Sequence, residues 1–164
     1  MFIKLTNLDV HLTWDDLRKL ADKYLPRGIS VYEIKSKESS VIIEGEATSP
    51  VSTPWSVCLE PLRTDDETSL VFHFKSIKVD GGLARTGLWF FKNLLRFDWS
   101  KDTEETLVEV CAKKMPGAWA EGKHLCIDLA RCLSELTGST VRIGTIKSFA
   151  ANKGGLHFVI QSAK

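Results

Sequence analysis

The chain has 164 residues, of which 43% are hydrophobic and 26% are charged, and its formal net charge is +1. This length and composition are typical of one globular domain, so we expect residues 1–164 to share a single hydrophobic core. A nearly neutral chain lacks the positive field that attracts phosphate backbones, which argues against nucleic-acid binding.

The first half of the chain predicts one helix followed by two β-hairpins. The helix is expected over 13–25, where Thr13 can cap its first turn in a capping box and hydrophobic residues recur every three to four positions. Hydrophobic residues then follow a period of two over 29–47, which is typical of a hairpin. Two prolines within 49–54 break the pattern, and a second hairpin is expected over 55–77.

The second half predicts three helices, a short strand and a closing hairpin. Residues 87–99 are the most hydrophobic stretch and are interpreted as a helix, and 103–114 form the next one, with acidic residues first and lysines last. A short strand is expected at 125–127, followed by a helix over 128–136 that begins at an aspartate cap. The closing hairpin is expected over 141–160.

The first and last hairpins resemble each other. Residues 29–36 align with 141–148 as two copies of an apolar-x-apolar-x-x-Ile-Lys-Ser pattern, and a capped helix precedes each copy. The alternative is chance, since strands with period-two patterns are often alike. We expect an α+β fold in which long antiparallel hairpins pack on helices, and a true repeat would make the sheet pseudo-symmetric.

No arrangement of residues indicates catalysis, a metal site or a cofactor. No two cysteines have the C-x-x-C spacing of zinc sites, and the histidines are too dispersed to indicate a metal site. No Gly-x-Ser-x-Gly turn or phosphate-binding loop occurs. We therefore expect a non-enzymatic protein without metal or cofactor. The cysteines and histidines of the chain are Cys58, Cys111, Cys126, Cys132, His11, His73, His124 and His157.

The sequence favours a cytoplasmic location. Residues 1–10 lack the basic start and apolar core of a signal peptide, and the cysteines are expected to be reduced and mostly buried. No apolar stretch approaches the roughly 20 residues that a transmembrane helix needs.

The aromatic-rich stretch 88–97 has three competing interpretations. It can be a central helix wholly used in packing, or a helix that lines a groove for a lipid or similar ligand. It can also be an interfacial helix that makes peripheral membrane contact, with Lys92 and Arg96 directed to the headgroups.

Three features of the sequence resemble the bacterial DUF2993 (LmeA-like) proteins and, more distantly, the tubular lipid-binding (TULIP) superfamily. They are the Leu12-Thr13-x-x-Asp16-Leu17 helix start with a hairpin ending at 41–45, the hairpin leading into 79–83, and Ile127-Asp128-Leu129 before the closing hairpin. The resemblance implies a long curved sheet wrapped on helices around a tunnel for acyl chains, with no catalytic residues. Family members often work in the cell envelope, and this chain departs from them by lacking a recognisable signal peptide.

These observations lead to the hypothesis that the chain binds a lipid or another elongated apolar ligand in a groove between sheet and helices, without catalysis. Apolar walls with few polar anchors are typical of such sites. The alternative is a protein-interaction or scaffold module, in which the same aromatic residues form an exposed patch or a homodimer face. The candidate ligand-binding residues are Trp89, Phe90, Phe91, Leu94, Leu95 and Phe97, with Met115 and Trp119 as weaker candidates.

Overall fold

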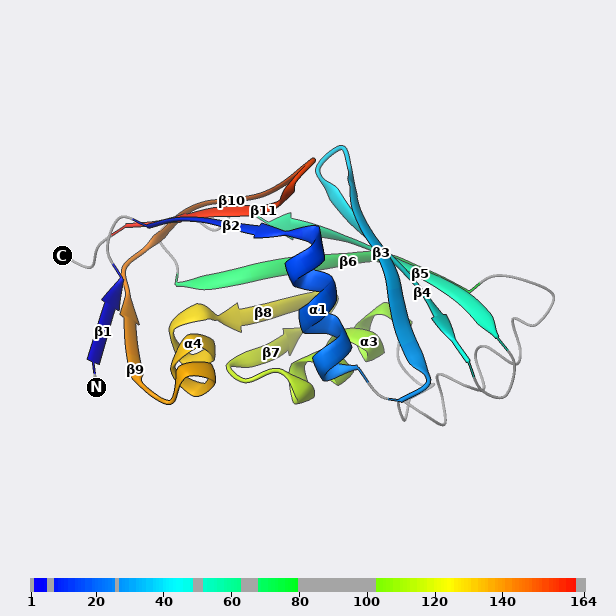
Figure 1. Cartoon of the computed structure of the whole chain (residues 1–164), viewed down its shortest axis with the longest axis horizontal. Coiled ribbons are helices and arrows are strands. Elements are labelled where there is room, and N and C mark those ends of the chain that lie inside the picture. Colours follow the sequence, from blue (N-terminus) through cyan, green and yellow to red (C-terminus); the bar gives the residue numbers. More distant parts are fainter. Residues whose placement is uncertain are drawn as a thin grey trace.

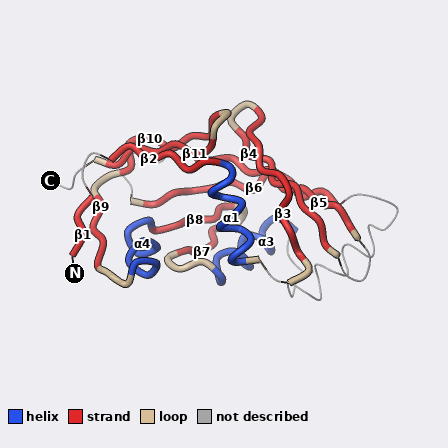
Figure 2. Tube along the Cα trace, in the orientation of Figure 1, coloured by secondary structure: helices blue, strands red, loops and turns tan. Residues whose placement is uncertain are grey.

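The computed structural model describes residues 2–5, 8–25, 27–48, 52–62, 68–79 and 103–161. Strands make up most of this part of the chain, and three helices accompany them (Figure 2). The expected α+β class is therefore confirmed. None of the helices in the described ranges has the length and apolar character needed to cross a membrane. The helices are α1 (Trp14–Tyr24), α3 (Thr103–Lys114) and α4 (Leu129–Thr137).

The larger sheet has six strands in the order β3-β4-β5-β6-β8-β7, and every neighbouring pair is antiparallel. Both hairpins predicted in the first half of the chain are present in it, and the second is longer at both ends than the pattern indicated. Figure 1 shows how the sheet twists from β3 at one edge towards β7 at the other. The strands are β3 (Ile29–Lys37), β4 (Ser40–Ala47), β5 (Thr53–Leu62), β6 (Ser69–Val79), β7 (Ala118–Glu121) and β8 (His124–Asp128).

One face of this sheet is apolar across all six strands. Residues opposite each other in neighbouring strands carry their side chains on the same face, so the register assembles continuous rows. The other face carries ion pairs such as those of Lys35 with Glu33 and Glu44, at 3.6 and 3.2 Å. We call the first face the apolar face; its buried members are Val31, Val41, Ala47, Trp55, Val57, Leu59, Leu70, Phe74, Leu125 and Ile127.

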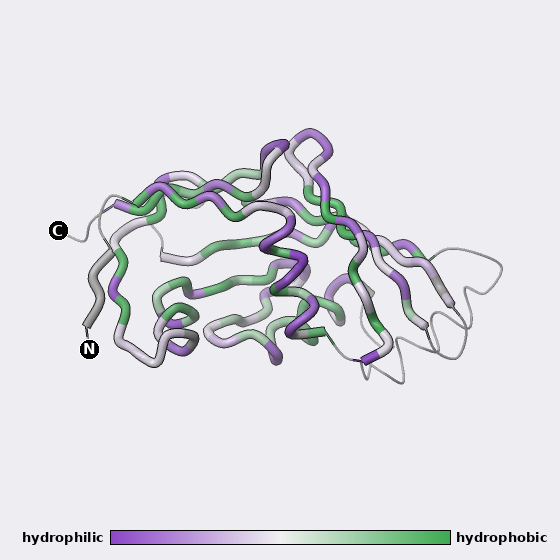
Figure 3. The backbone as a smooth tube through the Cα atoms, viewed as in Figure 1, coloured by the Kyte–Doolittle hydropathy of each residue, from purple (hydrophilic) through white to green (hydrophobic). Residues whose placement is uncertain are grey.

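A three-stranded antiparallel sheet, in the order β10-β11-β2, packs against the apolar face. Phe149 of β10 meets Phe72 of β6 edge to face, with the ring centroids 5.1 Å apart. Hydrophilic and hydrophobic residues alternate along β2 and β11, as expected for strands with one buried face (Figure 3). The strands are β2 (Leu8–Thr13), β10 (Ile146–Asn152) and β11 (Gly155–Ile160).

The helix predicted at 13–25 is α1, and its start is confirmed in detail. Thr13 Oγ1 accepts a hydrogen bond from the Asp16 backbone, and the Asp16 carboxylate accepts one from the Thr13 backbone. The Trp14 indole donates to the Lys153 carbonyl at 3.1 Å, which ties the start of α1 to the β10–β11 turn. From there α1 runs down to β3 and packs beside it (Figure 1).

The helices predicted at 103–114 and 128–136 are α3 and α4. Asp128 caps α4 by accepting a hydrogen bond from the Arg131 backbone, and Gly138 ends it in the left-handed conformation, at φ 67°. Helix α3 ends at Lys114, before a turn that leads into β7. The boundaries of α4 follow from its capping residues, which is why local sequence predicted them well.

Three features of the fold differ from the sequence-based expectations, and one expectation cannot be compared with the structure. Strands β1 (Phe2–Leu5), β2 and β7 were not predicted, and β1 pairs in parallel with β9 (Thr140–Ile143). The first strand of the closing hairpin is divided, because the chain leaves β9 at 144–145 and joins a different sheet as β10. Pro54 lies within β5, so the break expected over 49–54 ends earlier. The helix expected at 87–99 lies outside the described residues.

Candidate functional site

The structure places two of the eight candidate ligand-binding residues, and the other six lie outside the described residues. Met115 follows α3 and is partly buried against the core. Trp119 lies on β7 opposite Cys126, on the face of the large sheet opposite to the apolar face. Its side chain is 40% exposed, and its indole nitrogen donates to Glu121 at 3.1 Å. The structure therefore does not bring Met115 and Trp119 together on one wall.

One row of the apolar face is formed by Val31, Gly45, Trp55 and Val79, one from each of four adjacent strands. A Cβ atom on Gly45 would lie 2.4 Å from Cζ2 of Trp55, so the indole ring lies directly against the glycine backbone. Glycine at this position thus makes room for a large aromatic side chain in the sheet. Val79 is the last residue of β6, so the row also contains the point where that strand ends.

Among the described residues, Trp55 carries the one buried indole N–H of this face. The ring is 7% exposed, and its Nε1 has no hydrogen-bond partner within the described structure. A buried indole N–H usually finds an acceptor, because losing its hydrogen bond to water costs about 1–3 kcal/mol. This N–H group can therefore donate a hydrogen bond to an acceptor from outside the described part of the chain.

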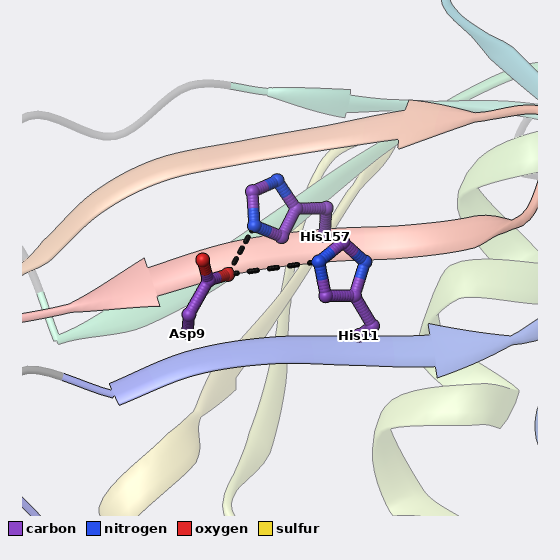
Figure 4. A group of neighbouring side chains, drawn as sticks. All are labelled: Asp9, His11 and His157. Atoms are coloured by element: carbon purple, nitrogen blue, oxygen red, sulfur yellow. Dashed lines mark hydrogen bonds and ion pairs between the residues drawn. The ribbon is translucent and has the colours of Figure 1, made fainter.

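A second cluster lies on the outer face of the three-stranded sheet (Figure 4). Asp9 and His11 are two residues apart on β2, so their side chains share one face, and His157 lies directly opposite His11 on β11. The two imidazole rings stack, with centroids 4.2 Å apart and planes 13° from parallel. Nε2 of His157 is hydrogen-bonded to Oδ1 of Asp9, and Nε2 of His11 lies 3.8 Å from the same oxygen.

The two remaining histidines also come together, on the polar face of the large sheet. His73 of β6 lies opposite His124 of β8, and their rings meet edge to face with centroids 5.1 Å apart. Glu60 of β5 and Glu121 of β7 continue the same row on either side. Lys75 pairs with Glu60 at 3.1 Å and donates to Ser40 at 2.9 Å. Four acidic and basic side chains thus line up across four strands.

Comparisons with known proteins assign no family. No protein-family model matches the chain, and neither the curated proteins nor the solved structures contain a match. The sites are therefore interpreted from their own geometry.

The four cysteines are free, and the structure gives two of them a structural character. Burial raises the pKa of the Cys111 thiol to about 11, and burial also raises the pKa of Cys132. A reactive cysteine needs a lowered pKa because the thiolate is the nucleophile. Cys111 and Cys132 therefore have the properties of packing residues.

Sequence reasoning missed both histidine pairs because each pair is made by strand pairing between distant segments. Asp9 and His157 are 148 positions apart. The detectable signal was the alternation Asp9-x-His11-x-Thr13, which marks one face of a strand, but β2 itself was not predicted. Dispersal along the sequence therefore did not mean dispersal in space.

We expect stability to depend on His73 at acidic pH. Burial and the neighbouring His124 lower the pKa of His73, so the unfolded chain binds a proton more readily than the folded one. The contribution of neutral His73 to the free energy of unfolding is fully present above the ordinary histidine pKa. It declines as the pH falls from there towards the lower pKa of the folded state. The urea midpoint of the wild type should fall more between pH 7.5 and pH 5 than that of His73→Gln. Equal falls in both proteins would contradict this prediction.

Proposed function

We propose that the chain is a non-enzymatic binding protein for an elongated apolar ligand that carries a polar acceptor, such as a lipid with a carbonyl or carboxylate group. The observation that carries the proposal is the buried Nε1 of Trp55 on the apolar face, which lacks a partner within the described structure. An acceptor on the ligand would satisfy this donor while the apolar part covers hydrophobic side chains.

The position of the aromatic-rich segment supports the same proposal. Residues 80–102 connect Val79, in the row that contains Trp55, with the start of α3 at Thr103. Helix α3 in turn contacts β6, β7 and β8. The two residues that flank the segment are therefore placed by the sheet and by a helix that contacts it. Seven of the ten residues in 88–97 are hydrophobic, which is the composition of a pocket wall.

We also propose that the fold is pseudo-symmetric and related to the TULIP superfamily. Each proposed repeat consists of a helix followed by a hairpin: α1 before β3 and β4, and α4 before β9, β10 and β11. The first strand of each copy is irregular at the matching place. Strand β3 has a register shift between Val31 and Glu33, and the second copy is interrupted between Ile143 and Ile146. A shared irregularity is a stronger sign of duplication than period-two patterns alone.

Native mass spectrometry of the purified chain, combined with organic extraction, tests the ligand proposal. We expect a co-purifying acyl species at one molecule per chain. Trp55→Phe should lower its occupancy by several-fold, because the variant keeps an aromatic ring but loses the N–H donor. Trp119→Phe is the matched control, since that indole lies on the opposite face and already has a partner. A chain that stays free of ligand after incubation with fatty acids and phospholipids would contradict the proposal. If it were also dimeric, a protein-interaction module would be favoured.

A further inference from the structure

We propose that Asp9, His11 and His157 form a binding site for one divalent transition-metal ion of the zinc, cobalt and nickel class. The site lies on the outer face of the small sheet, away from Trp55 and the apolar face. This inference is independent of the ligand proposal above, because it rests on different residues on another sheet.

Three donor groups come together on the outer face of the small sheet. One ligand atom from each residue lies within 4.8 Å of the others. The imidazole nitrogens of His11 and His157 both face Oδ1 of Asp9 (Figure 4). A metal ion bound to all three would lie about 2.0–2.2 Å from each donor. The stacked rings would tilt out of parallel on binding, because the Nε2 lone pairs lie in the ring planes and both must point at the ion. The ion would replace the proton that now joins His157 to Asp9.

The types of donor atom determine which metal ions the site prefers. Two imidazoles and one carboxylate suit zinc and its neighbours in the first transition series, whereas Ca²⁺ and Mg²⁺ prefer oxygen donors alone. The site contains no sulfur ligand, which disfavours Cu(I). Among the divalent ions of the series, affinity should rise from Co²⁺ to Ni²⁺.

The solvent exposure of the three donor side chains indicates an open, exchangeable metal site. The side chains of Asp9 and His11 are 65% and 64% exposed, and that of His157 is 30% exposed. Three protein ligands on an open surface leave at least one coordination position to solvent, which is the arrangement of exchangeable sites and not of closed structural ones. The bound ion would therefore accept water or a small anion as a further ligand.

The backbone beneath the donors is well fixed. Six consecutive residue pairs hold β2 to β11 without a register shift, from Thr13 opposite Gly155 to Leu8 opposite Ile160. On the inner face, Leu156, Phe158 and Ile160 are buried, so slipping the register by one residue would expose them. The three donor residues therefore keep their relative positions without the metal, and binding need not order the backbone.

The test uses the untagged chain of 164 residues after removal of metal with EDTA. Calorimetric titration with ZnCl₂ and NiCl₂ should give one ion per chain, and CoCl₂ should give visible absorption bands without the intense sulfur-to-metal bands of thiolate coordination. His11→Gln and His157→Gln should each weaken binding by more than tenfold, since losing even an outer partner of a metal ligand costs about 10- to 100-fold. His124→Gln is the matched control, because it removes an imidazole from the other histidine pair.

Two results would overturn the site. One is binding to His157→Gln as tight as to the wild type, and the other is no uptake at millimolar metal. Should a variant fail to fold, the wild type alone decides through its imidazole NMR signals. Substoichiometric Zn²⁺ must shift the signals of His11 and His157 and leave those of His73 and His124 unchanged. Shifts confined to His73 and His124 would count against the proposal.

Discussion

Replacing Gly155 with alanine should lower the free energy of unfolding by about 2–4 kcal/mol. A Cβ atom at this position would lie 1.9 Å from the carbonyl oxygen of Leu12, and the φ of Gly155 is +152°, where L side chains are rarely found. The obstructing atom belongs to the β2 backbone, so it cannot move aside without disturbing the pairing of Gly155 with Thr13. Equilibrium urea unfolding of both proteins measures the difference.

Gly154→Ala provides the matched control for this prediction. It lies one residue earlier in the same turn, and a Cβ there would meet only the side-chain oxygen of Asn152, at 3.5 Å. We expect its effect to stay within about 0.5 kcal/mol, as for most surface substitutions. Equal destabilisation by the two variants would show that general turn flexibility matters, and not the close approach of β11 to β2.

The parts of the fold that were predicted correctly depend on information within about fifteen residues. The limits of α1 and α4 follow from Thr13, Asp128 and Gly138, whose side chains or backbone conformations end the helices directly. The hairpins over 29–47 and 55–77 follow from period-two patterns around polar turns. In each case the residues that specify the structure are neighbours in the sequence.

The parts that were missed depend on contacts between distant segments. Phe2 pairs with Thr140, and nothing in the first five residues indicates such a parallel partner. The closing hairpin was expected to be continuous, but β9 pairs with β1 in a separate sheet and only β10 pairs with β11. This difference arises from tertiary contacts with the N-terminal strand. The candidate metal site was missed for the same reason, since His157 reaches His11 only through the pairing of β2 with β11.

The two proposed sites lie on different faces of the two packed sheets: the ligand site on the apolar face of the large sheet, and the metal site on the outer face of the small sheet. The small sheet contributes its inner face, with Phe149 and Phe158, to the core over the large sheet, and its outer face carries Asp9, His11 and His157. Because side chains alternate between faces, substitutions at the outer cluster remove no core contacts. Variants in the metal site should therefore leave both stability and apolar-ligand binding largely unchanged, which allows each proposal to fail separately.

Replacing Ile146 with alanine should lower the free energy of unfolding by about 3–4 kcal/mol. Ile146 has no exposed surface and lies directly opposite Ile160, which is 1% exposed. Truncation removes buried apolar area and leaves a cavity in the layer between the two sheets, where surrounding side chains are held by strand pairing on both sides. Val159→Ala is the control, because Val159 is half-buried and lies on the outer face beside Asp9. We expect it to cost less than about 1.5 kcal/mol.

The contact between Ile146 and Ile160 can be tested further by a double-mutant cycle with valine at both positions. Each single change removes one methyl group and should cost about 0.5–1.5 kcal/mol. Residues in direct contact share the space that each substitution opens, so the double variant should differ from the sum of the singles by about 0.5 kcal/mol or more. Strict additivity would mean that the two side chains pack against separate neighbours, although they are paired in the sheet. That result would place the principal contacts of β10 with the large sheet instead of with β11.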